Sequence, residues 1–196
     1  LDNKEQVLKL FQEADALLQG HFQLTSGKHS EWYFEKIRLI EKPRTLEKLV
    51  DLLVEKVMAE NRNFEYVVSP AYGAIAIGFL AALKLKKKFA FTQRLEEKMS
   101  FRPGWVGIED TRAIVIEDIL TTGRSIQEVV ECLRQRDVKV AGTYVLVDRT
   151  TGEVLIEGVP VRSLLALKVE AFDPDSCPFC KRGMLLTKPG GSDKKP

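Results

Sequence analysis

Residues 114–125 of the chain read IVIEDILTTGRS. The apolar run at residues 113–116 is typical of a strand that is buried on both faces of a parallel sheet. Two carboxylates, Glu117 and Asp118, follow this run, and a short turn rich in hydroxyl groups leads into a helical pattern. Because ligands of open α/β sheets bind beyond the carboxyl ends of the strands, this order of elements predicts a ligand site in an α/β domain.

The turn offers the chemistry that binds a phosphate group. The first turn of a helix presents unpaired backbone N–H groups and the positive end of the helix dipole. Thr121, Thr122 and Ser125 add hydroxyl donors, and Gly123 lets the backbone approach a ligand closely. The paired carboxylates would repel a phosphate, so we expect them to face ribose hydroxyls or a magnesium ion shared with the ligand.

Ordinary helix capping is the alternative explanation for this turn. Asp, Thr and Ser are common capping residues, and the turn alone fits capping about as well as it fits a ligand site. An acidic pair at the end of an apolar strand has no capping role, which favours the ligand site. The turn contains neither the Gly-Lys-Ser or Gly-Lys-Thr of a nucleotide P-loop nor the G-x-G-x-x-G of a dinucleotide fold.

The bulk composition predicts one cytoplasmic domain. A chain of 196 residues with 44% hydrophobic content can bury one sizeable core. The net charge of +2 gives no general attraction to nucleic acid. The longest apolar stretch, residues 71–83, is interrupted by two glycines and is shorter than the ~18 residues of a membrane span. The polar N-terminus shows no signal peptide, so we expect neither a membrane nor a nucleic-acid partner.

The hydrophobic periodicity predicts alternating helices and strands. Apolar residues at helical spacing predict helices, one of them buried, and short apolar runs predict strands. Such alternation implies a mostly parallel sheet with right-handed crossovers. We expect a single domain over residues 1–188 and a flexible tail over residues 189–196. The expected elements are helices at 6–18, 43–57, 74–83 (the buried one) and 125–134, strands at 32–34, 64–69, 89–92, 113–116 and 138–147, and a charged loop at 94–104.

Residues 114–125 resemble the signature of the type I phosphoribosyltransferases, in which apolar residues and two acids precede Thr-Thr-Gly. Three further segments resemble the orotate phosphoribosyltransferases in particular. Residues 20–30 match their N-terminal hood, G-x-F-x-L-x-S-G-x-x-S, residues 69–75 match their pyrophosphate loop, and residues 147–149 match the strand end whose arginine holds the orotate carboxylate. The order and spacing of these motifs extend the resemblance over nearly the whole chain, and residues 158–180 resemble one bacterial branch.

The resemblance implies a fold and a reaction. The fold is an α/β type I phosphoribosyltransferase fold, with a central mostly parallel sheet flanked by helices and a small hood from about residues 1–40 and the C-terminal strand region. The reaction makes orotidine 5′-phosphate and pyrophosphate from orotate and 5-phosphoribosyl-1-pyrophosphate, in pyrimidine (UMP) biosynthesis. Mg²⁺ is the implied cofactor, held mainly through the ligand, so no protein metal ligands are assigned. The implied assembly is a homodimer whose mobile loop reaches the neighbouring subunit's site.

The resemblance also implies the site residues, position by position. Phosphoribosyl pyrophosphate would contact Ala71, Tyr72, Gly73, Arg94, Lys98, Glu117, Asp118, Ile119, Leu120, Thr121, Thr122, Gly123, Arg124 and Ser125. Orotate would contact Tyr33, Phe34, Thr121 and Arg149. The turn would hold the 5-phosphate, the acidic pair the ribose, and residues 71–73 the pyrophosphate. Lys98 would be catalytic. A planar guanidinium at Arg149 suits a carboxylate because it can donate two parallel hydrogen bonds.

Some of these residues have simpler explanations. Arg149 is otherwise a surface arginine in a turn, and core packing explains Tyr33 and Phe34 nearly as well as base binding does. The charged stretch at residues 94–104 is otherwise a solvated loop, although a stretch of that kind within a compact domain is more often functional.

The chain also departs from the family pattern. Leu95 and Ser100 replace a lysine and a histidine of the mobile loop, and Thr25 and Gly73 stand where a lysine is frequent. Compensation by Arg102 or Lys28 is one interpretation of these losses.

The cysteines admit several explanations. Cys177 and Cys180 form a C-x-x-C pair, and a structural zinc site usually needs four ligands. His21 and His29 are far away in sequence, so we expect no metal, although a disulfide, free thiols or a metal shared by two subunits remain open. Cys132 lies among apolar helix residues and is expected to be core rather than reactive.

Two other functions compete with this prediction. A regulator that senses phosphoribosyl pyrophosphate would keep the turn but could lose the catalytic loop, and the missing loop lysine and histidine make it worth weighing. Against it, no DNA-binding helical module is apparent and the charge is balanced. A phosphoribosyltransferase for another base is the second alternative, and Arg149 with the hood favours an acidic pyrimidine. Loss of the orotate absorbance band on mixing with phosphoribosyl pyrophosphate and magnesium separates the three functions.

Overall fold

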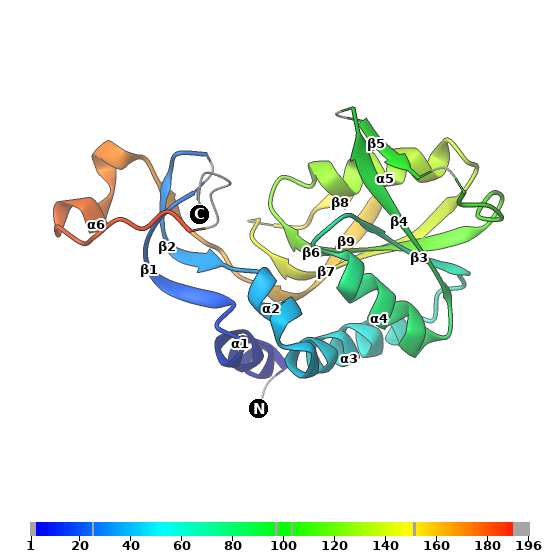
Figure 1. Cartoon of the computed structure of the whole chain (residues 1–196), viewed down its shortest axis with the longest axis horizontal. Coiled ribbons are helices and arrows are strands. Elements are labelled where there is room, and N and C mark those ends of the chain that lie inside the picture. The colour runs from blue at the N-terminus through cyan, green and yellow to red at the C-terminus, as the bar shows by residue number, and fades with distance from the viewer. Residues whose placement is uncertain (1–2, 25, 97, 103, 151, 190–196) are drawn as a thin grey trace.

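The main sheet carries the seven strands β3 to β9. The computed structural model describes residues 3–24, 26–96, 98–102, 104–150 and 152–189 (Figure 1). The strand order is β5-β4-β3-β6-β7-β9-β8, with parallel pairing from β4 to β9 and antiparallel pairing at both edges. The strands are β3 (Tyr66–Pro70), β4 (Lys88–Leu95), β5 (Lys98–Phe101), β6 (Arg112–Leu120), β7 (Lys139–Asp148), β8 (Leu155–Ile156) and β9 (Val159–Ala166).

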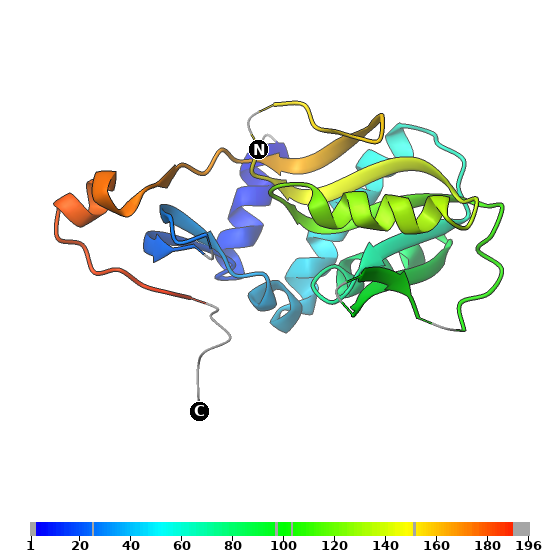
Figure 2. The same cartoon turned by 90° about the horizontal axis from the view of Figure 1, so that it is seen from above.

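Helices cover both faces of this sheet. In Figures 1 and 2, α1, α3 and α4 lie on one face and α5 lies on the other. The residues that the structure describes form two hydrophobic cores, one between the sheet and α1, α3 and α4, the other between the sheet and α5. Within β6, Ile114 and Ile116 belong to the first core, whereas Ala113 and Val115 belong to the second. Because successive side chains of a strand point to opposite faces and both faces of β6 are buried, this strand is apolar at consecutive positions. The helices are α1 (Asn3–Glu13), α2 (Ile37–Glu41), α3 (Pro43–Ala59), α4 (Ile75–Leu85), α5 (Arg124–Arg134) and α6 (Pro178–Lys181), with a 3-10 turn at Pro174–Ser176.

A second, three-stranded sheet stands beside the main sheet (Figures 1 and 2). We call it the hood sheet. It joins the hairpin of β1 (Leu17–Gln23) and β2 (His29–Phe34) to β10 (Ala171–Phe172), in the order β1-β2-β10. The C-terminal segment thus returns to the N-terminal hairpin, and an isolated bridge pairs Phe22 with Thr187.

The mostly parallel α/β sheet flanked by helices confirms the predicted fold class. The expected strands at residues 64–69, 89–92, 113–116 and 138–147 correspond to β3, β4, β6 and β7, and residues 32–34 belong to β2. Among the described residues, no helix is both long and apolar enough to cross a membrane. Thr25, Glu97, Pro103 and residues 190–196, which belong to the predicted hood, loop and tail, lie outside the described residues.

The predicted helix at residues 6–18 is wrong at its C-terminal end. The helix ends at Glu13, Asp15 adopts a positive φ of 53°, and Leu17 and Leu18 begin β1. Leu17 pairs with Phe34 and is buried, whereas Leu18 is half-buried. Two adjacent leucines are compatible with the end of a helix and with the start of a strand, so the apolar pattern alone misplaced the boundary.

Two further expectations need correction. The predicted loop at residues 94–104 contains the β4–β5 pairing, in which Met99 and Phe101 are buried while Lys98 is exposed. Period-two alternation was therefore present, but the charged neighbours concealed it. The helix α4 is not wholly buried, because Phe79 and Leu83 are exposed on its outer face.

Candidate active site

A cleft of about 610 Å³ opens at the carboxyl ends of β3, β6 and β7, between the main sheet and the hood sheet. Its location agrees with the site that open α/β sheets use. Most of the predicted site residues line it, namely Tyr33, Phe34, Ala71, Tyr72, Gly73, Arg94, Glu117, Asp118, Ile119, Thr121, Thr122, Ser125 and Arg149. Leu120, Gly123 and Arg124 line a smaller adjoining pocket around the turn. Lys98 lines neither pocket and lies instead beside α5.

The turn between β6 and α5 is shaped for close approach of a ligand. Gly123 adopts φ 79°, a left-handed conformation that glycine adopts without a Cβ penalty, and α5 begins at Arg124. Gly123 occupies the N-cap position, and no side chain caps the helix there. Thr122 Oγ1 accepts only a long hydrogen bond of 3.4 Å from the Arg124 N–H. The first N–H groups of α5 therefore remain available to an anion.

Two carboxylates lie on the floor of the cleft. Glu117 and Asp118 are 7% and 5% exposed at the end of β6. Glu117 Oε1 accepts a hydrogen bond of 3.0 Å from the Asp118 N–H, and Asp118 Oδ1 accepts one of 2.6 Å from the Ile119 N–H. Burial, and then the neighbouring charge of Asp118, raise the pKa of Glu117 to about 8. The pair thus carries less negative charge near neutral pH than its composition suggests.

Lys36 is a cleft residue that the sequence analysis missed. Its Nζ lies 2.9 Å from Asp118 Oδ2, and the side chain lines the same cleft. Burial is the largest influence and opposes its charge, but the charge of Asp118, the hydrogen bond to Asp118 and the charges of Glu117 and Tyr33 together raise the pKa of Lys36. The only sequence signal was its position two residues after Phe34, because the contact with Asp118 is long-range.

Gly73 brings the loop after β3 against this ion pair. A Cβ at Gly73 would lie 2.3 Å from Asp118 Oδ2 and 2.9 Å from Lys36 Nζ. A larger residue would therefore have to displace the two side chains. Lys28 and Arg102, considered above as replacements for the missing lysines, do not line the cleft, and Lys28 pairs with Asp173 at 3.3 Å. Among the described residues, the cations that line the cleft are Lys36, Arg94 and Arg149.

Arg149 presents a guanidinium that needs a partner. It follows β7, and its backbone N–H donates to Leu120 O at 3.0 Å. Its Nε is buried, and no acceptor for it exists among the described residues. Burial lowers the pKa of Arg149, and burial also raises the pKa of Tyr33 beside it. A buried donor without an acceptor is costly, so this position favours an anionic ligand.

Phe34 and Arg94 line the cleft but also make contacts outside it. Phe34 is 7% exposed and packs edge-on against Phe11 with ring centroids 5.6 Å apart, so core packing accounts for most of its environment. Arg94 at the end of β4 donates to Glu128 of α5. The same Glu128 accepts from Arg124 at 2.8 Å.

The structure places the C-x-x-C pair beside the two histidines, and the expectation that no metal binds there stays a prediction. Although His21 and His29 are far from Cys177 and Cys180 in sequence, the hood sheet brings all four side chains together. Cys132 is buried in the α5 core, where its Sγ donates to Met99 O at 2.8 Å, in agreement with its predicted core role.

Comparison with known proteins agrees with this geometry. Residues 39–175 match the family model described as "Phosphoribosyl transferase domain". The chain is 38% identical over 188 residues to the orotate phosphoribosyltransferase of Desulforamulus reducens, covering 96% of this chain and 97% of that protein. It is 40% identical over 182 residues to that of Carboxydothermus hydrogenoformans, covering 93% and 95%.

A solved structure extends the likeness to three dimensions. The orotate phosphoribosyltransferase from Aeropyrum pernix superposes with a TM-score of 0.67 at 28% identity, covering 83% of this chain and 94% of that one. Sequence relatives at more than 30% identity over nearly the full length, together with the matching fold, lead to one assignment. The chain belongs to the orotate phosphoribosyltransferase family.

Proposed function

We propose that this protein transfers ribose 5-phosphate from 5-phosphoribosyl-1-pyrophosphate to orotate, giving orotidine 5′-phosphate and pyrophosphate for pyrimidine (UMP) synthesis. One observation carries the proposal. A single cleft joins a turn suited to an anion, residues 121–125, to the half-buried Arg149, whose buried Nε has no acceptor among the described residues. The substrates have matching chemistry, because a phosphate stands at one end and the orotate carboxylate at the other.

The turn is suited to the 5-phosphate. Its helix N-terminus offers backbone N–H groups and a favourable dipole, and the hydroxyls of Thr121, Thr122 and Ser125 line the same cleft. Glu117 and Asp118 lie next to the turn on the cleft floor. Carboxylates there accept hydrogen bonds from the ribose hydroxyls and keep the sugar oriented.

The pyrophosphate would lie between the loop of residues 71–73 and Lys36. Gly73 leaves the backbone accessible beside the Lys36–Asp118 pair. Lys36 then supplies a positive charge close to the position where other family members carry a loop lysine. This charge would stabilise the leaving group as its bond to the anomeric carbon breaks.

Arg149 and Tyr33 form the base end of the cleft. The planar guanidinium of Arg149 can donate two parallel hydrogen bonds to the orotate carboxylate. This contact fixes the ring so that its nitrogen faces the anomeric carbon. The C–N bond forms there while pyrophosphate departs with the electron pair of the C–O bond, the proton of the ring N–H passes to pyrophosphate or solvent, and no protein nucleophile is required.

Magnesium fits this site mainly through the ligand. The carboxylate oxygens Glu117 Oε1, Asp118 Oδ1 and Asp118 Oδ2 already contact N–H groups of the chain or Lys36, which leaves no complete oxygen shell for a bare cation. The acidic pair would give only supporting contacts to a Mg²⁺ ion that the ligand brings into the cleft. When bound, the ion would supply positive charge to the departing pyrophosphate.

Lys98 would act on the cleft of a neighbouring subunit. It is exposed on β5 and lies outside the cleft of its own chain. A homodimer in the cytoplasm, with β5 of one subunit closing over the other subunit's cleft, would bring Lys98 to the leaving pyrophosphate. Closure would also exclude water from the reacting centre.

The decisive experiment follows orotate consumption directly. The purified protein is mixed with orotate, phosphoribosyl pyrophosphate and Mg²⁺, and the orotate absorbance is followed over time. We expect the absorbance to fall, and to remain constant when Mg²⁺ is removed by a chelator. Turnover of a purine base with no loss of orotate would reject the proposal in favour of another base. Binding of phosphoribosyl pyrophosphate without turnover of any base would favour a regulator.

A further inference from the structure

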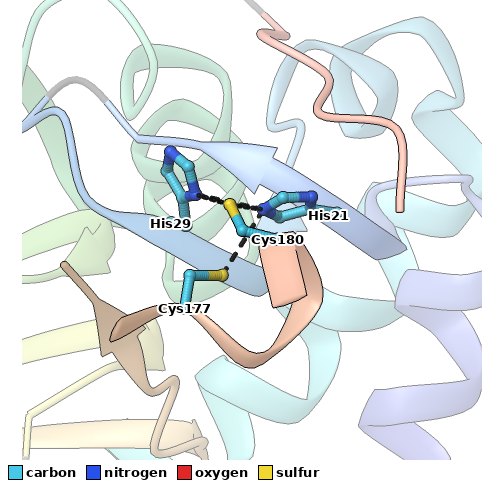
Figure 3. Close-up of side chains that lie close together, drawn as sticks. All are labelled: His21, His29, Cys177 and Cys180. Carbon is cyan, nitrogen blue, oxygen red and sulfur yellow. Dashed lines mark hydrogen bonds between the residues drawn. The ribbon is translucent and has the colours of Figure 1, made fainter. Parts of the chain in front are cut away.

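A compact cluster of four potential metal ligands lies in the hood sheet, away from the cleft residues. His21 comes from β1, His29 from β2, and Cys177 and Cys180 flank the start of α6 (Figure 3). Their ligand atoms all lie within 4.8 Å of one another. In Figure 3 the four side chains, from segments far apart in the sequence, point toward one common point.

Four of the six separations between the ligand atoms are close to those of a tetrahedral metal site. His21 Nε2 lies 3.1 Å from His29 Nδ1 and 3.5 Å from Cys177 Sγ. Cys180 Sγ lies 3.2 Å from His29 Nδ1 and 3.7 Å from His21 Nε2. Bonds of ~2.0–2.3 Å around zinc place tetrahedral ligand atoms about 3.3–3.8 Å apart. Only small adjustments would therefore bring all four atoms to bonding distance.

A backbone contact orients one of the histidines for this role. His21 Nδ1 lies 2.9 Å from Met184 O, a carbonyl that accepts a hydrogen bond. Nδ1 must then carry the proton, so the lone pair of Nε2 points toward the two sulfurs. Metal-binding histidines commonly have their second nitrogen fixed in this way. A cluster held only by packing would not need such an orientation.

The burial and charge of the cluster also suit a divalent ion. His21, His29 and Cys177 are 3%, 5% and 0% exposed, and all three cysteines of the chain are free. Two thiolates balance the charge of one divalent cation, so the loaded site is neutral. Two sulfur and two nitrogen donors in tetrahedral array select zinc over the harder cations.

Little apolar packing joins the described part of the C-terminal segment to the tip of the hairpin. One hydrophobic core takes in Leu17 and Phe34 at the base of the hairpin, but neither core contains Phe22, Cys177 or Phe179. The C-terminal segment is tied to the hairpin by the two-residue pairing of β10, by the Phe22–Thr187 bridge and by Phe179 stacked near His21. A small unit with so little apolar packing is of the kind that proteins stabilise with a metal or disulfides.

We propose that His21, His29, Cys177 and Cys180 of one chain bind one structural Zn²⁺ ion, which fastens the C-terminal segment to the N-terminal hairpin. All four ligands come from the protein, so no position is left open for a substrate. The ion would act on the reaction only by holding in place the hood, whose residues Leu24, Ser26 and Tyr33 line the cleft.

The first test measures metal content in the full-length protein purified without chelators or metal-affinity resin. We expect about one zinc per chain by elemental analysis. Cys177→Ser with Cys180→Ser should lose it, and His29→Ala should lose most of it, whereas the control Cys132→Ser should retain it. Zinc near zero in the wild type, or equal zinc in all variants, would overturn the proposal. One zinc for every two chains would also overturn it, because the site would then be shared between subunits.

Cobalt provides a spectroscopic check that does not depend on enzyme activity. Protein stripped by a chelator under reducing conditions and reloaded with Co²⁺ should show thiolate-to-cobalt absorption and the visible bands of tetrahedral cobalt. The Cys177→Ser, Cys180→Ser variant should show neither. The bands of octahedral cobalt alone in the wild type would contradict the ligand set. If thiol titration of the denatured, metal-free protein purified without reductant gives one thiol instead of three, the pair is a disulfide and the proposal fails.

Limited proteolysis tests the structural role. Trypsin sites lie at the last residue of α6, Lys181, and directly after it, at Arg182. Chelator treatment should accelerate cleavage there by at least about tenfold, because local opening of the C-terminal segment would no longer cost the metal–ligand bonds. Added Zn²⁺ should restore resistance in the wild type but not in the cysteine variant. Equal cleavage rates with and without chelator would contradict the fastening role.

Discussion

The two ends of the cleft are built in different ways. The phosphate end comes from the contiguous residues 117–125, where backbone N–H groups and several hydroxyls can each donate a hydrogen bond to the ligand. The other end is assembled from distant segments, in which single side chains such as Lys36 and Arg149 carry the charge. We therefore expect single substitutions to be mild at the contiguous end and severe at the assembled end.

The largest effect is expected at Lys98, the residue assigned to a neighbouring subunit. Lys98→Ala should lower kcat on the order of 10²–10³-fold, because it removes a charge that would stabilise the departing pyrophosphate. The melting temperature should change little, because the side chain is exposed. Steady-state kinetics and thermal denaturation measure both quantities. Full turnover in the variant would remove Lys98 from the mechanism.

Mixing two inactive variants sharpens this test. When Lys98→Ala and Arg149→Ala chains are unfolded and refolded together, half of the dimers are hybrids with one intact site, so about a quarter of the wild-type activity should return. Each variant refolded alone is the control. No recovery would mean that Lys98 serves the cleft of its own chain.

Arg149→Ala should lower kcat/KM for orotate by roughly 30- to 150-fold, since a charged hydrogen-bonded pair contributes ~2–3 kcal/mol. Arg149→Lys should recover only part of this loss, because an ammonium group cannot donate two parallel bonds. The ligand-free variant should melt at a higher temperature than the wild type, because it no longer buries an unpaired Nε. Unchanged orotate kinetics would show that the base carboxylate is held elsewhere.

Lys36→Met should raise KM for phosphoribosyl pyrophosphate by about tenfold, equivalent to ~1.4 kcal/mol, with a smaller effect on orotate. The substitution removes the partner of Asp118 and a positive charge from the cleft while retaining the aliphatic stem. Lys28→Met is the matched control, because Lys28 pairs with Asp173 outside the cleft. Equal effects of the two variants would indicate a general loss of positive charge instead of a specific contact.

The pKa of Glu117, at the contiguous end, depends on its neighbour Asp118 and also on Lys36 of the assembled end. The folded-state pKa of about 8 lies above the ordinary 4.5, so the folded protein binds the additional proton between these values and loses stability as the pH rises through them. Glu117→Gln should remove this dependence. Its stabilisation relative to wild type should reach about 1–2 kcal/mol at pH 8.5 and shrink toward pH 5. Melting curves across that range give the difference, and a constant offset would contradict the raised pKa.

Thr122→Ala should have the smallest effect. Loss of one neutral hydrogen bond to the phosphate, ~0.5–1.5 kcal/mol, should raise KM for phosphoribosyl pyrophosphate by about 2- to 10-fold, because backbone N–H groups remain. The Arg149→Ala variant is the comparison at the other end of the cleft. If Thr122→Ala proved as damaging as Arg149→Ala, the contrast between the two ends would not hold.

The elements that were predicted well are those with a local signal. The apolar run before Glu117 and the helical spacing after Gly123 fixed β6 and α5, because burial on both faces and burial on one stripe leave different periods in the sequence. The boundary at Leu17 was misplaced because helical and strand periods cannot be told apart over so few residues, and the β4–β5 pairing was missed because its charged residues concealed the alternation.

By itself, the sequence determined the α/β class, the turn that can bind a phosphate and the acidic pair beside it, because all of their chemistry lies within a dozen neighbouring residues. Only the tertiary structure decided that Lys36 pairs with Asp118, that the buried Nε of Arg149 has no acceptor in the described part of the chain, and that two histidines meet two cysteines more than a hundred residues away. Such contacts depend on strand order and on the return of the C-terminal segment to the hood sheet. No local pattern of residue types encodes these distances, since they result from packing the whole chain.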